Sequence, residues 1–114
     1  MNTRQNPKEL AVALMSRSRC SVQVGCVIAD SNGVFAWGWN SSGPDGFGLC
    51  AERHAISRAN KWRLGYATFY IAASRRKHGR PVIAKPCAKC QAVIDHYGAK
   101  RIYWRDHDGT WRNY

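Results

Sequence analysis

Long hydrophobic runs are missing from this sequence. No stretch approaches the roughly eighteen consecutive apolar residues that a membrane-spanning helix requires, and no N-terminal segment combines a basic start with an apolar run long enough for export. The sequence also contains neither an internal repeat nor a low-complexity linker. We therefore expect a soluble, cytoplasmic protein without a membrane partner, folded as a single domain over residues 1–114.

Acidic residues are scarce. Seven Asp and Glu stand against 18 Lys and Arg, which gives a formal net charge of +11. The surface must therefore carry a net positive field, which favours anionic partners such as nucleic acid, free nucleotides or acidic membranes. Charge alone does not rank these partners, and a plain solvated basic surface would have the same composition.

What the sequence does contain is a regular alternation of helix and strand signals. Helices are predicted over 7–18, 50–61 and 86–98, and strands over 21–29, 34–39, 67–73 and 101–105. Asn32-Gly33 between the first two strands indicates a hairpin, whereas the segments 40–48 and 74–85 are predicted to be loops. Because the later strands are separated by helices, parallel pairing and an α/β layer architecture follow.

Five cysteines are present, and three of them lie where two of the predicted helices begin. In a reducing compartment, closely spaced cysteines indicate metal binding or redox chemistry rather than disulfides. Backbone N–H groups at a helix start stabilise thiolates, the form that binds zinc. Cys87 and Cys90 project within about 60° of each other on an ideal helix, so that one ion can reach both sulfurs. Cys50 is the expected third ligand.

Three protein ligands leave the fourth tetrahedral position of zinc for a water molecule, which distinguishes a catalytic zinc site from a structural one. Glu52 is two residues from Cys50 and is predicted to move protons between that water and a substrate. Three thiolates outweigh the charge of a divalent ion, so a positive group should offset them. Arg53 is the nearest candidate in sequence.

Two other interpretations of these cysteines stay open. Cys87 and Cys90 have the spacing of a redox pair. Alternatively, Cys50, His54, Cys87 and Cys90 could close a structural four-ligand zinc site. Ideal helix geometry favours this closed site, because Cys50 and His54 are within about 40° of each other whereas Glu52 projects about 200° away from Cys50.

The motifs Cys50-Ala51-Glu52-Arg53 and Pro86-Cys87-Ala88-Lys89-Cys90 resemble those of the cytidine deaminase superfamily. The resemblance covers roughly residues 21–104. It implies a three-layer α/β/α fold with a mixed sheet, shortened at the C-terminus, and a Zn²⁺-dependent hydrolytic deaminase that converts cytosine to uracil. In it, Cys50, Cys87 and Cys90 would be the metal ligands, Glu52 the catalytic residue and Arg53 a support for the thiolates.

Substrate identity is less well determined by the sequence. The CAER form resembles the enzymes that act on free cytidine, whereas Gly38-Trp39-Asn40 resembles deoxycytidylate and polynucleotide deaminases, in which the matching asparagine contacts the sugar or base. Asn40 is therefore a candidate substrate-binding residue, although asparagine is also a common turn residue. We expect a cytosine-containing nucleoside or nucleotide as substrate, in either the ribose or the deoxyribose series.

Two alternatives involve nucleic acid. The basic segment 74–85 is longer than the connection in many relatives, and it contains Arg75, Arg76, Lys77 and Arg80, which could grip single-stranded DNA or RNA beside an active site. Aromatic residues could stack on bases, Phe47 among them. The non-enzymatic alternative is a zinc-bearing nucleic-acid-binding module that uses the closed site. Assembly into a homo-oligomer is also expected by analogy with relatives.

Overall fold

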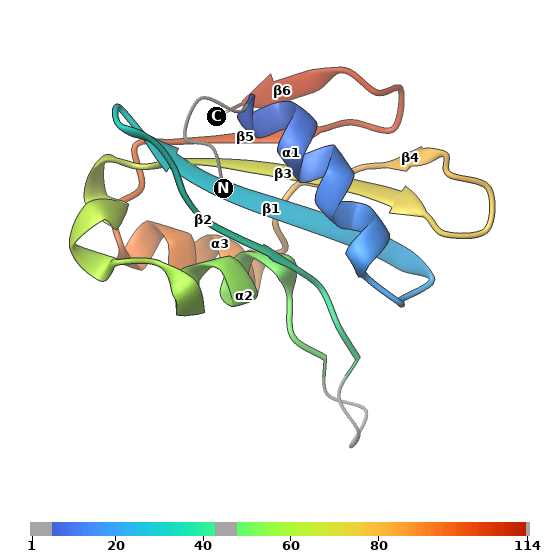
Figure 1. The fold of residues 1–114 in the computed structure, drawn as a ribbon, viewed down its shortest axis with the longest axis horizontal. Helices are drawn as coiled ribbons and strands as arrows, with labels where there is room; N and C mark the ends of the chain where they lie inside the picture. The colour runs from blue at the N-terminus through green and yellow to red at the C-terminus, as the bar shows by residue number, and fades with distance from the viewer. Residues whose placement is uncertain (1–5, 43–47, 114) are drawn as a thin grey trace.

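A mixed β-sheet forms the centre of the protein and carries helices on both faces (Figure 1). The computed structural model describes residues 6–42 and 48–113. The strands are β1 (Val22–Asp30), β2 (Gly33–Trp39), β3 (Thr68–Arg75), β4 (Pro81–Val82), β5 (Arg101–Arg105) and β6 (Trp111–Asn113). The helices are α1 (Pro7–Leu14), α2 (Ala51–Arg58) and α3 (Ala88–His96), together with the 3₁₀ helices η1 (Met15–Arg17) and η2 (Lys61–Tyr66). None of the helices described is long and apolar enough to cross a lipid bilayer.

The sheet is mixed, as predicted. Its order is β2-β1-β3-β5-β6, and β4 pairs with the end of β3. The β1–β2, β1–β3 and β5–β6 pairs are antiparallel, whereas β3 and β5 run parallel because α3 lies between them in the chain. The predicted hairpin is present: Asp30 pairs with Gly33, and Gly33 has a φ of 109°, which a residue with a side chain rarely adopts.

Two buried clusters show that the fold has three layers. On one face of the sheet, Leu10 and Leu14 of α1 pack with Val27 of β1. On the other face, Ile56 of α2 and Ile94 of α3 belong to a separate cluster. Successive strand residues point to opposite faces, so β1, β2 and β3 contribute to both clusters. Figure 1 shows the same arrangement, with α1 on one side of the sheet and α2 and α3 on the other. The predicted α/β/α fold is confirmed.

A glycine sets the distance between α2 and the sheet. A Cβ atom added to Gly38 of β2 would lie 2.5 Å from the backbone nitrogen of Ala55 and 2.9 Å from the carbonyl carbon of His54. Real Cβ atoms do not approach backbone atoms this closely, so only glycine allows α2 to pack against β2 at its observed distance. The start of α2 is thereby held close to the edge of the sheet.

Several boundaries differ from the prediction. The helix predicted over 50–61 ends at Arg58, because Ala59 is extended and Asn60 caps the following η2 through its bond from the Trp62 N–H. The strands β4 and β6 were not predicted. Both are short and pair with a neighbouring strand, which local sequence does not reveal. Part of the loop predicted over 40–48, including Phe47, lies outside the described residues.

Candidate active site

A small cavity lies where the starts of α2 and α3 meet the sheet face formed by β1 and β3. Its volume is about 210 Å³. The lining residues come from both helix starts, from the two strands and from the segment before α3: Val22, Val24, Asn40, Cys50, Ala51, Glu52, Ala73, Ile83, Ala84, Lys85, Cys87 and Cys90. We call this space the thiol cavity. It brings together the three cysteines and the glutamate that the sequence singled out.

Cys50 and Cys87 hold equivalent positions at the two helix starts. Each is the N-cap residue of its helix, with extended backbone angles, ψ being 149° at Cys50 and 166° at Cys87. Neither side chain caps the helix by a hydrogen bond. The pKa of Cys87 is lowered, and the largest cause is the backbone N–H of Cys90 in the first turn of α3. The start of α3 therefore favours a thiolate at Cys87.

The three thiols of the cavity contact one another through Cys90. Cys90 is buried, Cys50 is half-buried and Cys87 is exposed. Burial raises the pKa of Cys90 most strongly, the charge of Glu52 raises it next, and hydrogen bonds with the thiols of Cys50 and Cys87 raise it further. The Cys90 thiol therefore lies within interaction range of the thiols of Cys50 and Cys87.

Glu52 is a buried carboxyl group in the wall of this cavity. Only 6% of its surface is exposed. Burial raises its pKa, while bonds from its own backbone N–H and from the Cys90 thiol act in the opposite direction. The ideal-helix argument that Glu52 projects away from Cys50 is wrong, because Cys50 is an extended cap residue and lies outside the helical arrangement.

His54 faces β2. Its Nδ1 atom lies 3.2 Å from the backbone nitrogen of Trp39 and 3.1 Å from the Trp39 carbonyl oxygen, and its ring packs edge-on against the Trp39 ring at 4.7 Å. His54 is not among the residues that line the thiol cavity. The arrangement therefore gives no support to the closed site in which His54 would be a fourth ligand.

Asn40 lines the thiol cavity and is also bonded to the backbone of β1. Its Oδ1 accepts from the Val24 N–H at 2.8 Å, and its Nδ2 donates to the Val22 carbonyl at 2.8 Å. The amide thus replaces a strand residue in the ladder just beyond the end of β2. One hydrogen of Nδ2 and one lone pair of Oδ1 are left for another partner.

Comparison with known proteins now decides the family. A family model that describes the cytidine and deoxycytidylate deaminase zinc-binding region matches residues 1–105. The chain belongs to this deaminase family. The comparison with curated protein sequences gave no match.

Solved structures of deaminases share the fold. Cytidine deaminase from Burkholderia pseudomallei has a TM-score of 0.73 at 20% identity, over 95% of this chain and 88% of that one. The dCMP deaminase of the cyanophage S-TIM5 has a TM-score of 0.67 at 20% identity, over 88% and 79%. Cytidine deaminase from Mycobacterium leprae has a TM-score of 0.61 at 21% identity, over 93% and 88%. At these identities the likeness supports the fold.

The donor atoms of this deaminase-family chain suit zinc. Three thiols reach one cavity, and thiolate sulfur is a preferred zinc ligand. Among the side chains of residues 6–42 and 48–113, however, no group of three or more His, Cys, Asp and Glu has the geometry of a ready metal site. The thiols of Cys50 and Cys87 nevertheless both act on the pKa of Cys90, so the three side chains are neighbours. Each sulfur can change position by rotation about its Cα–Cβ bond, and Cys50, Cys87 and Cys90 are the residues that would hold the ion.

The structure also places Arg53 relative to the thiol cavity and adds residues to the cavity wall that the sequence did not single out. Arg53 is half-buried, does not line the thiol cavity, and makes no hydrogen bond or ion pair with any residue that the structure describes. Lys85 does line the cavity, and its only sequence signal is its position directly before Pro86-Cys87. The apolar wall formed by Val22, Val24 and Ala73 was not identified, because it depends on strand register.

Proposed function

We propose that this protein is a zinc-dependent hydrolytic deaminase that converts cytosine to uracil in cytidine or deoxycytidine nucleosides or nucleotides. The observation that carries the proposal is the meeting of Glu52 with Cys50, Cys87 and Cys90 in one cavity at the starts of two helices. Membership of the deaminase family supports the same reaction. The match over residues 1–105 also supports a single deaminase domain.

In this proposal the three thiolates hold the metal. Cys50 stands at the N-cap of α2, whereas Cys87 stands at the N-cap of α3 and Cys90 in its first turn. A bound zinc ion makes a water molecule acidic enough to act as a nucleophile near neutral pH. Arg53 is proposed to offset the charge of the thiolates through the field it adds at the start of α2, since no direct bond joins it to them.

Glu52 is proposed to move the protons. Its carboxylate first accepts a proton from the attacking water and delivers it to N3 of the cytosine ring while oxygen bonds to C4. It then transfers the second proton of that water to the amino group, and the C4–N bond breaks to release ammonia. Cytosine and water are thus converted to uracil and ammonia. The burial of Glu52 supports this role because bulk water is kept away from the proton in transit.

The apolar wall and Asn40 are proposed to position the substrate. Val22, Val24 and Ala73 form a flat surface of the sheet that suits a pyrimidine ring. The free hydrogen on Nδ2 of Asn40 is available to a sugar hydroxyl or a base oxygen. Because both atoms of the Asn40 amide are already fixed by β1, its direction is set before the substrate binds.

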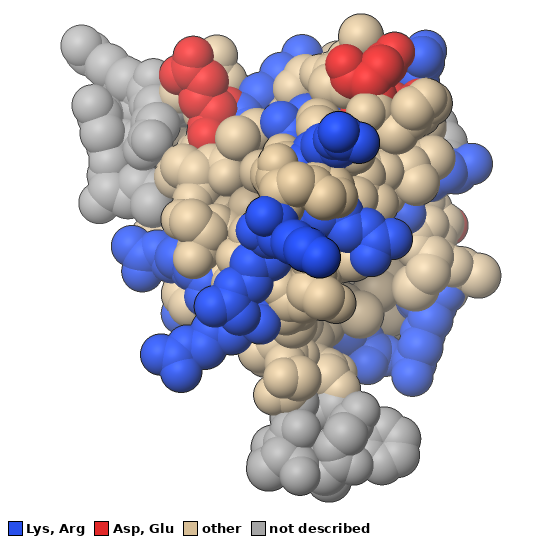
Figure 2. Space-filling view, turned by 90° about the vertical axis from the view of Figure 1, so that its right-hand side faces the viewer, with Lys and Arg blue, Asp and Glu red and all other residues tan. Residues whose placement is uncertain are grey.

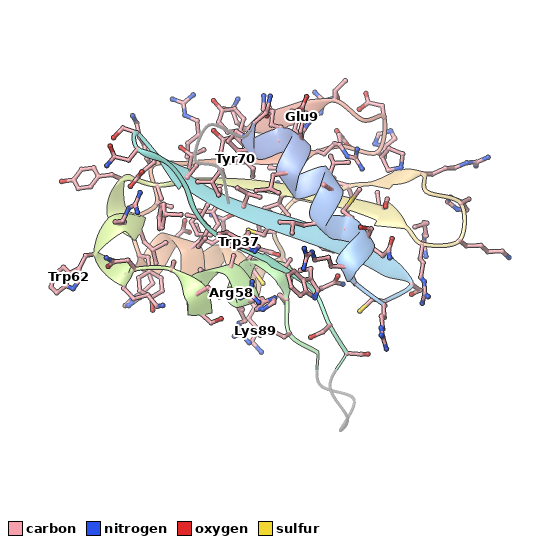
Figure 3. All side chains as sticks on the ribbon, in the orientation of Figure 1. Glu9, Trp37, Arg58, Trp62, Tyr70 and Lys89 are labelled. Atoms are coloured by element: carbon pink, nitrogen blue, oxygen red, sulfur yellow. The ribbon has the colours of Figure 1, made fainter. Side chains whose placement is uncertain are left out.

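The proposal is tested by replacing Glu52 and measuring two properties. Glu52→Ala should lower the rate of ammonia release from cytidine or deoxycytidine by at least about a hundredfold, while its zinc content should match that of the unsubstituted protein. Glu9→Ala is the matched control, since Glu9 is an exposed carboxylate on α1, away from α2 and α3 (Figure 3). Unchanged ammonia release by Glu52→Ala would contradict the mechanism.

A further inference from the structure

A strongly basic depression opens at the end of β3 where the chain turns toward β4. It has a volume of about 860 Å³ and is lined by Arg19, Ser21, Arg75, Arg76, Lys77 and His78. We call it the basic hollow. Figure 2 shows this side of the molecule, with Lys and Arg gathered across the middle and Asp and Glu only toward the margins.

The cations of the basic hollow have no carboxylate partner among the residues that the structure describes. No carboxylate lines it. The ion pairs found among residues 6–42 and 48–113 lie elsewhere, joining Asp30 to Arg63 and Asp106 or Asp108 to residues near β6. The side chains of Arg75 and Lys77 make no hydrogen bond or ion pair within the described part of the chain. Uncompensated cations in a concave surface attract anions.

Strand register places the basic hollow directly beside the thiol cavity. Val24 pairs with Ala73, and Val22 pairs with Arg75. Paired residues of antiparallel strands point to the same face, and so do residues two apart along a strand. Val22, Val24 and Ala73 line the thiol cavity. Arg75 therefore projects from the same face of the sheet as Val22, Val24 and Ala73. On that face, the pair of Val22 and Arg75 lies next to the pair of Val24 and Ala73.

A second route joins the same two spaces. Arg19 lines the basic hollow and also a smaller depression that it shares with Asn40. Asn40 in turn lines the thiol cavity. The thiol cavity is thus followed by lining residues of the basic hollow on two sides, along the strands β1 and β3 and past Asn40 toward Arg19.

The backbone of the hollow is held in place before any ligand binds. The Arg76 N–H donates to the Ser21 carbonyl at 2.9 Å, and the Arg76 Nη1 donates to the Arg19 carbonyl at 3.1 Å. Within the turn, the Gly79 N–H donates to the Arg75 carbonyl at 2.7 Å, and Gly79 has a φ of 70°. The turn is therefore fixed to the segment before β1, which lowers the cost of ordering the cations around an anion.

We propose that the basic hollow binds a phosphate attached to the cytosine nucleoside in the thiol cavity, with Arg75 as the main contact, so that the protein selects phosphorylated substrates. The inference rests on the proposed deaminase function and adds the substrate class. Phosphate is the anion that a nucleoside carries one sugar away from its base, and a guanidinium binds it by two parallel hydrogen bonds. The same chemistry serves a free nucleotide and a strand.

The experiment compares substrates that differ only in phosphate. We expect kcat/KM to be higher for dCMP than for deoxycytidine, and Arg75→Ala to lower the ratio of the two values by about tenfold or more, as expected for the loss of charge-assisted bonds. Arg101→Ala removes the same charge from an exposed position opposite Thr68, at the far end of β3, and should leave the ratio unchanged. Lys77→Ala in the exposed turn provides a second variant if Arg75→Ala does not fold.

Equal kcat/KM values for dCMP and deoxycytidine, or an unchanged ratio in both Arg75→Ala and Lys77→Ala, would overturn the proposal. A binding measurement separates this failure from failure of the deaminase function. Calorimetry with dUMP and deoxyuridine needs no turnover, and tighter binding of dUMP that is lost in Arg75→Ala would support the phosphate site even if no ammonia were released. Absence of that preference would contradict it.

The source of the phosphate is distinguished by two further arms. An oligodeoxynucleotide with a single cytosine and the free nucleotides dCMP and dCTP are compared at two salt concentrations. Preference for dCMP or dCTP assigns the hollow to free nucleotides, and preference for the oligonucleotide with a steep loss at high salt assigns it to a strand. Either preference supports a phosphate contact, whereas rates no higher than that of deoxycytidine for all three would contradict it.

Discussion

Glu52 and His54 are two residues apart on α2, but their side chains contact different parts of the protein. Glu52 is buried against the three thiols, whereas the His54 ring is bonded to the Trp39 backbone on the far side of the helix. A histidine whose Nδ1 already has a backbone partner is fixed in orientation as well as in position. We therefore assign His54 to the packing of α2 on β2.

This assignment predicts zinc contents that separate a three-cysteine site from the closed site. His54→Asn places an amide atom near the position of Nδ1, so it should keep the bond to Trp39 and bind as much zinc as the unsubstituted protein. Cys87→Ser should lose most of the zinc, since it removes a thiolate ligand. Cys20→Ser is the control, because Cys20 does not line the thiol cavity. Loss of zinc from His54→Asn in a folded protein would favour the closed site, and atomic emission on the purified variants provides the measurement.

For single residues, the sequence motif identified Glu52 and the cysteines but not the directions in which their side chains point. The motif identified Glu52 and the three cysteines, and the structure brings all four to one cavity. Helical arithmetic gave the wrong direction for Glu52, since it treated Cys50 as a helical residue when its ψ of 149° places it outside the helix. The contacts of Asn40 were not predictable, because they depend on how β1 and β2 pair, and the place of Lys85 depends on the path of the chain between β4 and α3.

At the scale of elements, α2 is positioned by its close approach to β2 at Gly38. The approach involves backbone atoms of α2, which cannot rotate away as a side chain can. Since Cys50 and Glu52 stand at the first turn of this helix, any outward movement of α2 displaces a proposed ligand and the proposed proton carrier together.

Gly38→Ala should therefore reduce both stability and zinc content. The added methyl group would overlap the backbone of α2, and overpacking of this kind costs about 1–3 kcal/mol in the free energy of unfolding. Gly65→Ala is the matched control, because a Cβ at Gly65 meets a single atom at 3.8 Å. Urea denaturation measures both variants. A Gly38→Ala protein as stable as Gly65→Ala would contradict the packing argument.

The start of a helix could be predicted from the sequence where a nearby residue marks it. Pro7, Cys50 and Cys87 mark helix starts in the sequence, and each observed helix begins within one residue of its mark. The ends of helices and the strands β4 and β6 depend on tertiary pairing. For example, β6 is held beside β5 by a turn in which the Asp106 carboxylate accepts from Arg112 and from the His107 N–H.

At the scale of the whole molecule, the proposed metal ligands connect two helices that share one face of the sheet. Cys50 caps the start of α2, Cys87 caps the start of α3, and Cys90 lies in the first turn of α3. An ion bound by all three would link these helices, and a ligand that binds only the folded chain stabilises it by mass action.

Removal of zinc should consequently lower the melting temperature. A site that is saturated about a hundredfold above its Kd adds about 2.7 kcal/mol, which corresponds to a decrease on the order of 10 °C on chelation for a chain of this size. Differential scanning calorimetry with and without a strong chelator measures this change. In Cys87→Ser the chelator should have little further effect. An unchanged melting temperature in the unsubstituted protein would contradict a metal that bridges the helices.

For the whole molecule, the net charge indicates which kind of partner to expect but not where on the surface that partner would bind. The value of +11 predicted a positive field and anionic partners but gave no location. The pairing of Val22 with Arg75 determines that part of this charge collects beside the thiol cavity. Single-stranded nucleic acid as a partner and assembly into a homo-oligomer stay predictions.

The parallel pairing of β3 with β5 also has a consequence for the order of folding. The β1–β2 hairpin closes locally, whereas β5 reaches β3 only after the intervening α3 has crossed over the sheet. Pairings between distant segments form slowly, because the entropy of closing the connection must be lost first. Before the sheet is complete, chain connectivity keeps only Cys87 and Cys90 near each other, and Cys50 reaches them when the two helix starts meet on the sheet. A complete three-thiolate site would then report that the chain has finished folding.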